Sequence, residues 1–208
     1  MSELFSIQLQ NRQQQGRDGI WLDLPTTTEQ VQAALRQIGI SSDNPQGLFI
    51  SGYFAEEEKR FAISYNMVLA SNVDELNFLA SRLETLSTGE RAELNAALQA
   101  PQSELFSIGR ITDFPENVDY YVHLPDVHGP AQLGDYYLNR SGMVDMPEEW
   151  KGGIDTAQFG RYVAQQEQGA FTQYGYLVKS GDEWQKVHEG QPVPEEYRVL
   201  SFPAPEVL

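Results

Sequence analysis

Short amphipathic segments, each closed by a proline or a glycine, follow one another along this chain and limit its fold to small strands and helices. Residues 4–10 alternate apolar and polar side chains as strands do, and residues 20–24 and 47–54 predict two further strands. Thr26 and Glu29 fit a capping box, so we expect a helix to begin between the second and third strands. The first third therefore predicts a strand–strand–helix–strand unit.

The middle of the chain carries helix signals only. Ser71 or Asn72 can cap a segment with apolar residues at helical spacing. A second capping box, Ser87 with Glu90, restarts a helix that Pro101 must end. Apolar stripes of this kind are typical of helices that pack on a core.

The last part of the chain returns to mixed structure. Residues 132–140 and 156–166 read as helices. Residues 170–179, 183–188 and 197–202 read as strands. The remaining stretches after residue 190 are rich in Pro and Glu and predict loop and tail.

A six-residue sequence occurs twice. Residues 2–7 and 103–108 both read SELFSI, and the strand–proline segment 21–25 is echoed by 121–125. This spacing favours a duplication of one α+β unit, with coincidence between two amphipathic strand pairs as the alternative.

These patterns predict an α+β fold: an elongated chain of small modules, in which antiparallel sheets with packed helices flank a central helical module. We place an N-terminal α+β module at 1–60, a helical module at 61–102 and a C-terminal α+β module with an extended strand region at 103–208. With 40% hydrophobic residues in 208, the chain can bury a core. It contains no cysteine, which excludes disulfides and thiolate metal sites.

The net charge of −16 limits the possible partners. Nucleic acids and anionic membranes attract positive surfaces, so direct binding to either is not expected. No apolar run reaches the length of a membrane span, and the first residues lack the apolar core of a signal peptide. We therefore expect a cytoplasmic protein.

Catalytic motifs are missing from the sequence. The chain has no P-loop, G-x-G-x-x-G, G-x-S-x-G or H-E-x-x-H pattern, and its three histidines have no metal-ligand spacing. The run Glu56, Glu57 and Glu58 lacks the alternation of a calcium loop. We predict neither an enzyme nor a cofactor; the alternative is a hydrolase built on two carboxylates about 5–10 Å apart, one of them buried with a raised pKa.

Acidic residues are spread unevenly. Residues 1–100 contain 13 acids and 7 bases, whereas residues 101–208 contain 17 acids and 7 bases. Nine acids of the second half recur along segments that look ordered: Asp113, Glu116, Asp119, Asp126, Asp135, Asp145, Glu148, Glu149 and Asp155. Carboxylates fixed at such intervals can imitate the phosphates that a DNA-binding cleft expects. From charge alone, however, solubility is the favoured explanation.

An ordered series of motifs resembles the ArdA antirestriction proteins, small acidic DNA mimics carried by plasmids and conjugative transposons. The resemblance covers roughly residues 4–176, and its most specific part is the stretch 133–176. The motifs are GIWLDLP at 19–25, FISGY at 49–53, DELNFLA at 74–80, LGDYY at 133–137, FGR at 159–161, GAFT at 169–172 and YGY at 174–176. The chain departs from the family at Gly52, at 156–158 and at Tyr162, and from Leu177 onward it looks like an extension.

The resemblance implies inhibition without catalysis. A homodimer would occupy the DNA groove of a type I restriction-modification enzyme, mainly its methyltransferase core, and block restriction of incoming DNA and possibly its modification. The nine acids above would then stand in for phosphates. An acidic protein that titrates another DNA-binding target, such as a nucleoid protein, a repressor or another defence nuclease, is the alternative.

Overall fold

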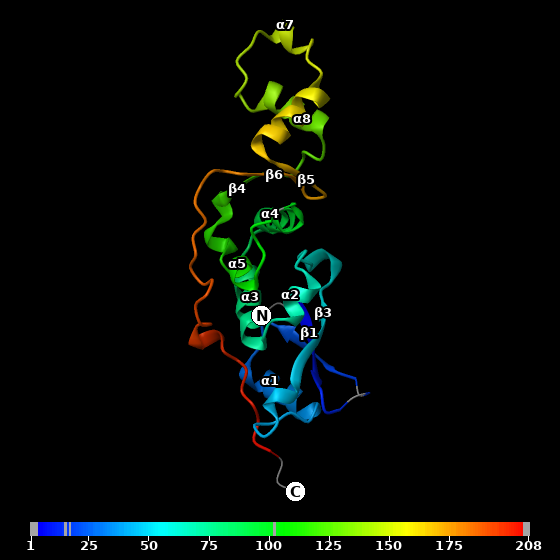
Figure 1. Cartoon of the computed structure of the whole chain (residues 1–208), viewed down its shortest axis with the longest axis vertical. Helices are drawn as coiled ribbons and strands as arrows, with labels where there is room; N and C mark the ends of the chain where they lie inside the picture. The colour runs from blue at the N-terminus through cyan, green and yellow to red at the C-terminus, as the bar shows by residue number, and fades with distance from the viewer. Residues whose placement is uncertain (1–3, 15, 17, 102, 206–208) are drawn as a thin grey trace. The chain divides into compact units, whose positions relative to one another are not determined.

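The computed structural model describes residues 4–14, 16, 18–101 and 103–205, and its contacts group them into two compact units, each built from parts distant in sequence (Figure 1). Unit 1 comprises Met1–Leu86, Leu105–Pro115 and Lys186–Leu208. Unit 2 comprises Ser87–Glu104 and Glu116–Gln185. Each unit contains helices and one antiparallel three-stranded sheet, so the predicted α+β class is confirmed.

Unit 1 is built around a sheet in the order β2-β1-β3. Its elements are β1 Phe5–Asn11, β2 Ile20–Leu24, α1 Thr28–Gln37, β3 Leu48–Phe54, α2 Tyr65–Leu69, α3 Val73–Glu84 and α5 Ile108–Thr112. The register places Phe5 opposite Leu24, and every second residue of β1 is buried, as the alternation predicts. Leu9, Leu24 and Leu35 are among the fully buried side chains of this core.

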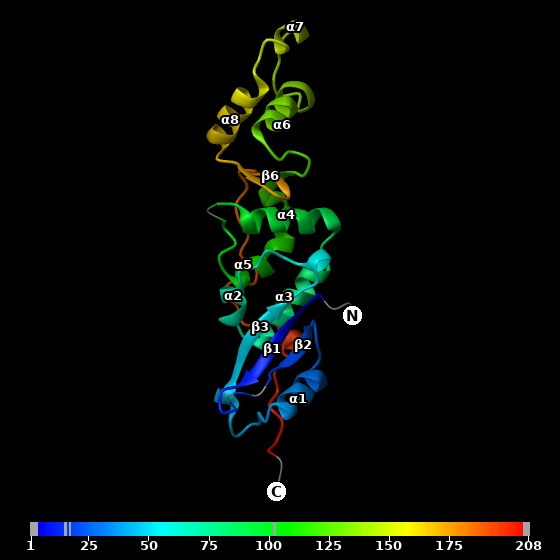
Figure 2. The same ribbon diagram turned by 90° about the vertical axis from the view of Figure 1, so that its right-hand side faces the viewer.

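Unit 2 has its own sheet in the order β4-β6-β5. Its elements are α4 Thr88–Gln99, β4 Tyr121–Leu124, α6 Pro130–Asp135, a π-helical turn Tyr136–Arg140, α7 Glu148–Lys151, α8 Thr156–Glu167, β5 Ala170–Thr172 and β6 Gly175–Lys179. Helix α4 packs on β4 and β6, and α6 packs along α8 (Figure 2). The single strand predicted at 170–179 is a hairpin, because residues 173 and 174 form a turn between β5 and β6.

Capping boxes start three of the helices. Asn72 and Ser87 each accept a backbone N–H three residues on, as two of the predicted starts require. The first predicted box is displaced by one residue: Thr27, not Thr26, caps α1, with Gln30 as its reciprocal partner. The Thr26 hydroxyl instead donates to the side-chain oxygen of Gln30 at 2.9 Å, and the Thr26 N–H donates to Asn77 Oδ1 at 2.7 Å.

The segment after β6 contains no strand in its described part, so the strands predicted at 183–188 and 197–202 are wrong. Carboxylates take the place of a neighbouring strand. Asp113 accepts the N–H groups of Val187, His188 and Glu189, and Asp74 Oδ1 accepts those of Val199 and Leu200. A backbone whose donors are satisfied in this way needs no sheet, and residues 187–190 form bends and a turn.

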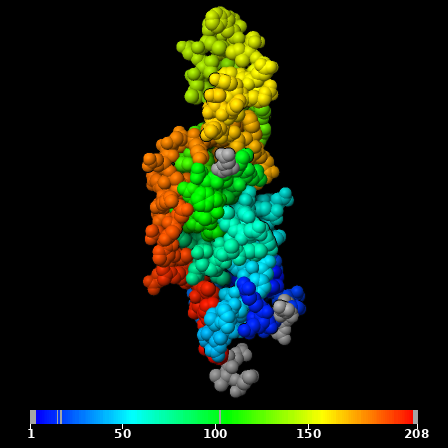
Figure 3. Space-filling view, in the orientation of Figure 1, coloured from blue at the N-terminus to red at the C-terminus, as the bar shows by residue number. Residues whose placement is uncertain are grey.

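The same segment continues along unit 1 towards the C-terminus. The Ser42 N–H donates to the Pro203 carbonyl at 2.9 Å, and Asn77 donates to the Tyr197 carbonyl at 3.0 Å. Figure 3 shows the red residues of this segment against the light-blue residues that precede β3. Residues 186–205 are therefore an integral part of unit 1.

The repeated sequence does not form a repeated structure. The first copy leads into β1, although Ser2 and Glu3 lie outside the described residues. In the second copy, Ser107 caps helix α5, and no residue from 103 to 108 belongs to a strand. The expectation that residues 103–108 begin a second strand pair is therefore wrong.

No helix in the described part of the chain is long and apolar enough to span a membrane.

Candidate functional site

Eight of the nine acids singled out in the sequence belong to unit 2, and Asp113 alone belongs to unit 1. Seven of the eight are exposed and Asp135 is half-buried: Glu116, Asp119, Asp126, Asp135, Asp145, Glu148, Glu149 and Asp155. Unit 2 contains 14 acids against five bases, a net charge of −9. Unit 1 is larger but carries only −7. Unit 2 is therefore the more negative part per residue.

Glycines allow the helices that carry several of these acids to pack closely. A Cβ added at Gly160 of α8 would overlap the carbonyl oxygen of Pro130 at the start of α6. A Cβ at Gly134 of α6 would overlap the carbonyl oxygen of Thr156 on α8. The two backbones thus touch directly, which fixes Asp135 and Asp155 on a rigid pair of helices.

A half-buried carboxylate joins α8 to the sheet. Glu167 at the end of α8 accepts hydrogen bonds from the hydroxyls of Tyr137 and Tyr176, the second at 3.0 Å. Burial and the bonded carboxylate raise the pKa of both tyrosines, so both stay protonated donors at neutral pH. Tyr176 also packs with Val127 and Leu133 in the core of the unit. Glu167 therefore has a structural role, since both of its carboxylate oxygens accept hydrogen bonds from within the unit.

Three of the surface acids already have local partners. Asp135 pairs with Arg140 at 3.2 Å, and Glu148 pairs with Lys151 at 2.6 Å. Asp155 caps α8 by accepting the N–H groups of residues 157 and 158. The field of each of these carboxylates is partly offset by a cation or by the helix N-terminus.

Four acids remain exposed without such a partner. Asp119, Asp126, Asp145 and Glu149 form no hydrogen bond or ion pair with any residue that the structure describes. They lie on a 3-10 turn before β4, on the loop after β4, before α7 and within α7. These four carboxylates are open to a partner from outside.

The sequence profile of the family described as "Antirestriction protein (ArdA)" matches residues 15–178. The chain belongs to the ArdA antirestriction family. A comparison with individual characterised proteins gives no match. The matched range includes all nine acids and ends within β6, so residues 179–208 of this ArdA protein lie beyond the profile.

One acid of this ArdA protein, Glu93, is not marked by any motif in the sequence. Burial, Glu90 and Asp119 together raise the pKa of Glu93 on α4 to about 8. Glu90 lies one turn earlier on the same helix and caps it, and this hydrogen bonding lowers its own pKa. The i, i+3 spacing of Glu90 and Glu93 is visible in the sequence, but the approach of Asp119 is not.

The raised pKa of Glu93 meets one requirement of the alternative hydrolase. The described residues that line the pocket of about 650 Å³ in unit 1 include neither Glu93, Glu90 nor Asp119. Glu90 and Asp119 lie near Glu93 because unit 2 is rich in acids, and none of these three acids lines that cavity.

Asp113 differs from the other eight acids. Its side chain has 0% exposure, and its oxygens accept three N–H groups at 2.6–3.2 Å. A phosphate stand-in must reach a partner, so we leave Asp113 out of the proposed contact set. The sequence around it gives no sign of this role, because its partners lie more than 70 residues away.

Proposed function

We propose that this ArdA protein is a DNA mimic that inhibits a type I restriction-modification enzyme by occupying the DNA groove of its methyltransferase core. The observation that carries the proposal is the set of exposed carboxylates on the short elements and loops of unit 2. Such a cleft is lined by Lys and Arg that meet phosphates, and fixed carboxylates can pair with the same cations. No covalent step is needed, because exclusion of DNA is sufficient to inhibit.

The proposed contact set is Glu116, Asp119, Asp126, Asp135, Asp145, Glu148, Glu149 and Asp155. Within it, the four acids without a local partner should contribute most, since an incoming Lys or Arg need not displace an existing cation. Single replacements should have small effects, because one exposed ion pair contributes only about 0–1 kcal/mol. The attraction is collective, so the test requires several replacements at once.

The test compares two quadruple variants of equal charge. The first replaces Asp119, Asp126 and Asp145 by Asn and Glu149 by Gln. The control replaces four exposed acids of unit 1 in the same way: Asp18→Asn, Asp43→Asn, Glu57→Gln and Glu58→Gln. Binding to a purified type I methyltransferase core, and competition with duplex DNA, are measured for both variants from about 50 to 200 mM salt.

We expect the unit 2 variant to bind at least tenfold more weakly than the unit 1 control, and binding of the unaltered protein to weaken as salt rises. Equal losses in the two variants would show that only net charge matters. Affinity that stays constant across the salt range would refute mimicry. The homodimer implied by the family is a separate prediction, which analytical ultracentrifugation tests.

A further inference from the structure

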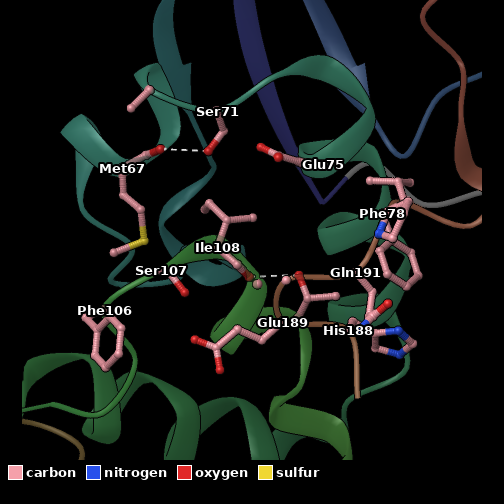
Figure 4. Close-up of a pocket in the computed structure, with 16 residues that line it drawn as sticks. Met67, Ser71, Glu75, Phe78, Phe106, Ser107, Ile108, His188, Glu189 and Gln191 are labelled. Carbon is pink, nitrogen blue, oxygen red and sulfur yellow. Dashed lines mark hydrogen bonds between the residues drawn. The ribbon is translucent and has the colours of Figure 1, made fainter. Parts of the chain in front are cut away.

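Unit 1 contains a pocket of about 650 Å³ that the proposed inhibition does not use. It lies between the end of α2, the first half of α3, the start of α5 and residues 188–193 (Figure 4). Its volume falls within the range of about 300–1,000 Å³ typical of sites for small organic molecules. All of its lining residues belong to unit 1.

One wall of this pocket is a feature beyond the family profile. Residues 188–193 follow the matched range, and the three hydrogen bonds to Asp113 fix the start of this wall. Gly109 on α5 lies against it, since a Cβ added there would be 3.2 Å from the Glu189 Cα. The cavity is thus formed by a segment that the common ArdA region does not supply.

The surfaces of the pocket are largely apolar. Phe78 and Ile108 are buried beneath it, and the Met67 thioether is half-buried at its side. Phe106 is 65% exposed at the rim. Such a lining favours a ligand with a hydrocarbon chain or ring, because contact removes apolar surface from water on both sides.

The charged groups that line the pocket are negative. Glu75 and Glu189 both line it, and none of the described lining residues is Lys or Arg. In the close-up, the carboxylate of Glu75 points into the opening above Ile108 (Figure 4). Arg110, which lies nearby, is engaged with Glu189 at 3.5 Å and stacks on the Phe106 ring at 4.8 Å.

Glu75 has capacity for a further partner. Its Oε2 accepts the Asn72 N–H at 3.4 Å, a long bond that closes the capping box of α3. Glu75 has no ion-pair partner among the residues that the structure describes. A carboxylate without a cation, beside apolar walls, is matched by a positive group on an apolar body.

We propose that this pocket binds a small organic cation, an ammonium group carried on an apolar chain or ring, with Glu75 as its charge partner. The apolar part contacts Met67, Ile108 and Phe106, and the ammonium group lies at the Glu75 carboxylate. This site is separate from the acids of unit 2, so it does not depend on the proposed inhibition.

The test uses three probes of one shape on the full chain: 4-phenylbutylammonium, 4-phenylbutanol and 4-phenylbutyrate. Binding is followed by chemical-shift changes in two-dimensional NMR spectra. We expect the cation to bind most tightly, with shifts at pocket amides such as those of Ser71, Gly109 and Gln191. The alcohol should bind about tenfold more weakly and the anion should not bind, since a hydrogen bond to a charged group contributes about 1.5 kcal/mol or more.

Two variants separate this site from general attraction to an acidic protein. Glu75→Gln should weaken binding of the cation about tenfold, and its amide oxygen can still accept the Asn72 N–H, so α3 keeps its cap. Glu58→Gln removes the same charge from an exposed position of unit 1 and should change nothing. A third variant, Ala70→Trp, places an indole at the pocket lining and should abolish binding while thermal unfolding confirms the fold.

The proposal is overturned if the cation and the alcohol bind equally. It is equally overturned if Glu75→Gln binds the cation as well as Glu58→Gln does, or if the shifts map outside the pocket. Antirestriction activity is not part of this readout, so the outcome is independent of whether DNA mimicry is correct.

Discussion

Replacement of Asp113 by Ala should loosen the C-terminal segment from unit 1. The carboxylate is fully buried and accepts the N–H groups of Val187, His188 and Glu189 at 3.2, 2.6 and 3.1 Å. A hydrogen bond to a charged group contributes about 1.5–3 kcal/mol, but these donors lie on a partly exposed segment where water can replace part of the loss. About 1 kcal/mol for each bond gives a loss of about 3 kcal/mol.

Urea denaturation measures this loss, and hydrogen exchange locates it. The amides of residues 187–189 should exchange much faster in the variant, because they no longer have an acceptor. In a chain of this size, about 3 kcal/mol corresponds to a fall in Tm of about 6–12 °C. Asp126→Ala is the matched control, since Asp126 is exposed and forms no ion pair with a described residue, so it should leave stability and exchange unchanged.

The opposite pattern would refute this reasoning. Suppose that Asp113→Ala unfolds at the same urea concentration as the unaltered protein but binds the restriction enzyme more weakly. Asp113 would then be a contact residue and not a buried acceptor of backbone N–H groups. If both stability and binding fall, Asp113→Asn is measured next. Asn retains one acceptor oxygen for the backbone N–H groups but carries no charge, so it separates a loss of stability from a loss of contact with the enzyme.

Two further changes test the packing and the charge of unit 2. Gly160→Ala should cost about 3 kcal/mol in a thermal-unfolding assay, because its Cβ overlaps the Pro130 carbonyl, whereas Gly152→Ala, with open space around it, should cost nothing measurable. Glu93→Gln should stabilise the protein at pH 8 by about 1–2 kcal/mol after allowance for solvent screening, with no effect at pH 5. The sign follows because the folded state, with a pKa of about 8, holds a proton that the unfolded state releases near pH 4.5, so stability falls as pH rises between these values. Urea denaturation from pH 5 to 8.5 checks this, and equal pH dependence in both proteins would contradict it.

Local signals in the sequence were sufficient for most elements. Alternation predicted β1, short apolar segments predicted β2 and β3, and the caps at Asn72 and Ser87 predicted α3 and α4, because all of these signals depend on residues close together in the chain. The cap of α1 lies one residue later than predicted because Gln30, and not Glu29, closes the box: its side-chain oxygen accepts both the Thr27 N–H and the Thr26 hydroxyl. Gln closes a capping box as Glu does, so the sequence marks the presence of this helix better than its first residue.

The same limitation explains the errors after residue 180. Residues 183–188 and 197–202 have the composition of strands, but a strand also requires a neighbour with free donors and acceptors. In this chain Asp113 and Asp74 supply the acceptors instead. Nothing near either aspartate in the sequence marks it as an acceptor of backbone N–H groups. The two false strands and the expectation that Asp113 meets a partner at the surface therefore have the same cause.

Acidity in this protein therefore serves two purposes that a count of carboxylates cannot separate. Asp74, Asp113 and Glu167 act inside the units, whereas the exposed acids of unit 2 are the ones that we propose to act on a partner. This division bears on the salt dependence of the proposed mimicry. Duplex DNA carries a charge about every 1.7 Å and condenses counterions, which are released when a cleft binds it. Eight carboxylates on separate short elements, three of them offset locally, lack that density and should condense fewer ions. Anions bound to the Lys and Arg of the cleft are released by either ligand. The affinity of the protein for the enzyme should therefore fall as salt rises, but less steeply than the affinity of DNA for the same enzyme. A mimic built in this way competes best where salt has already weakened the binding of DNA.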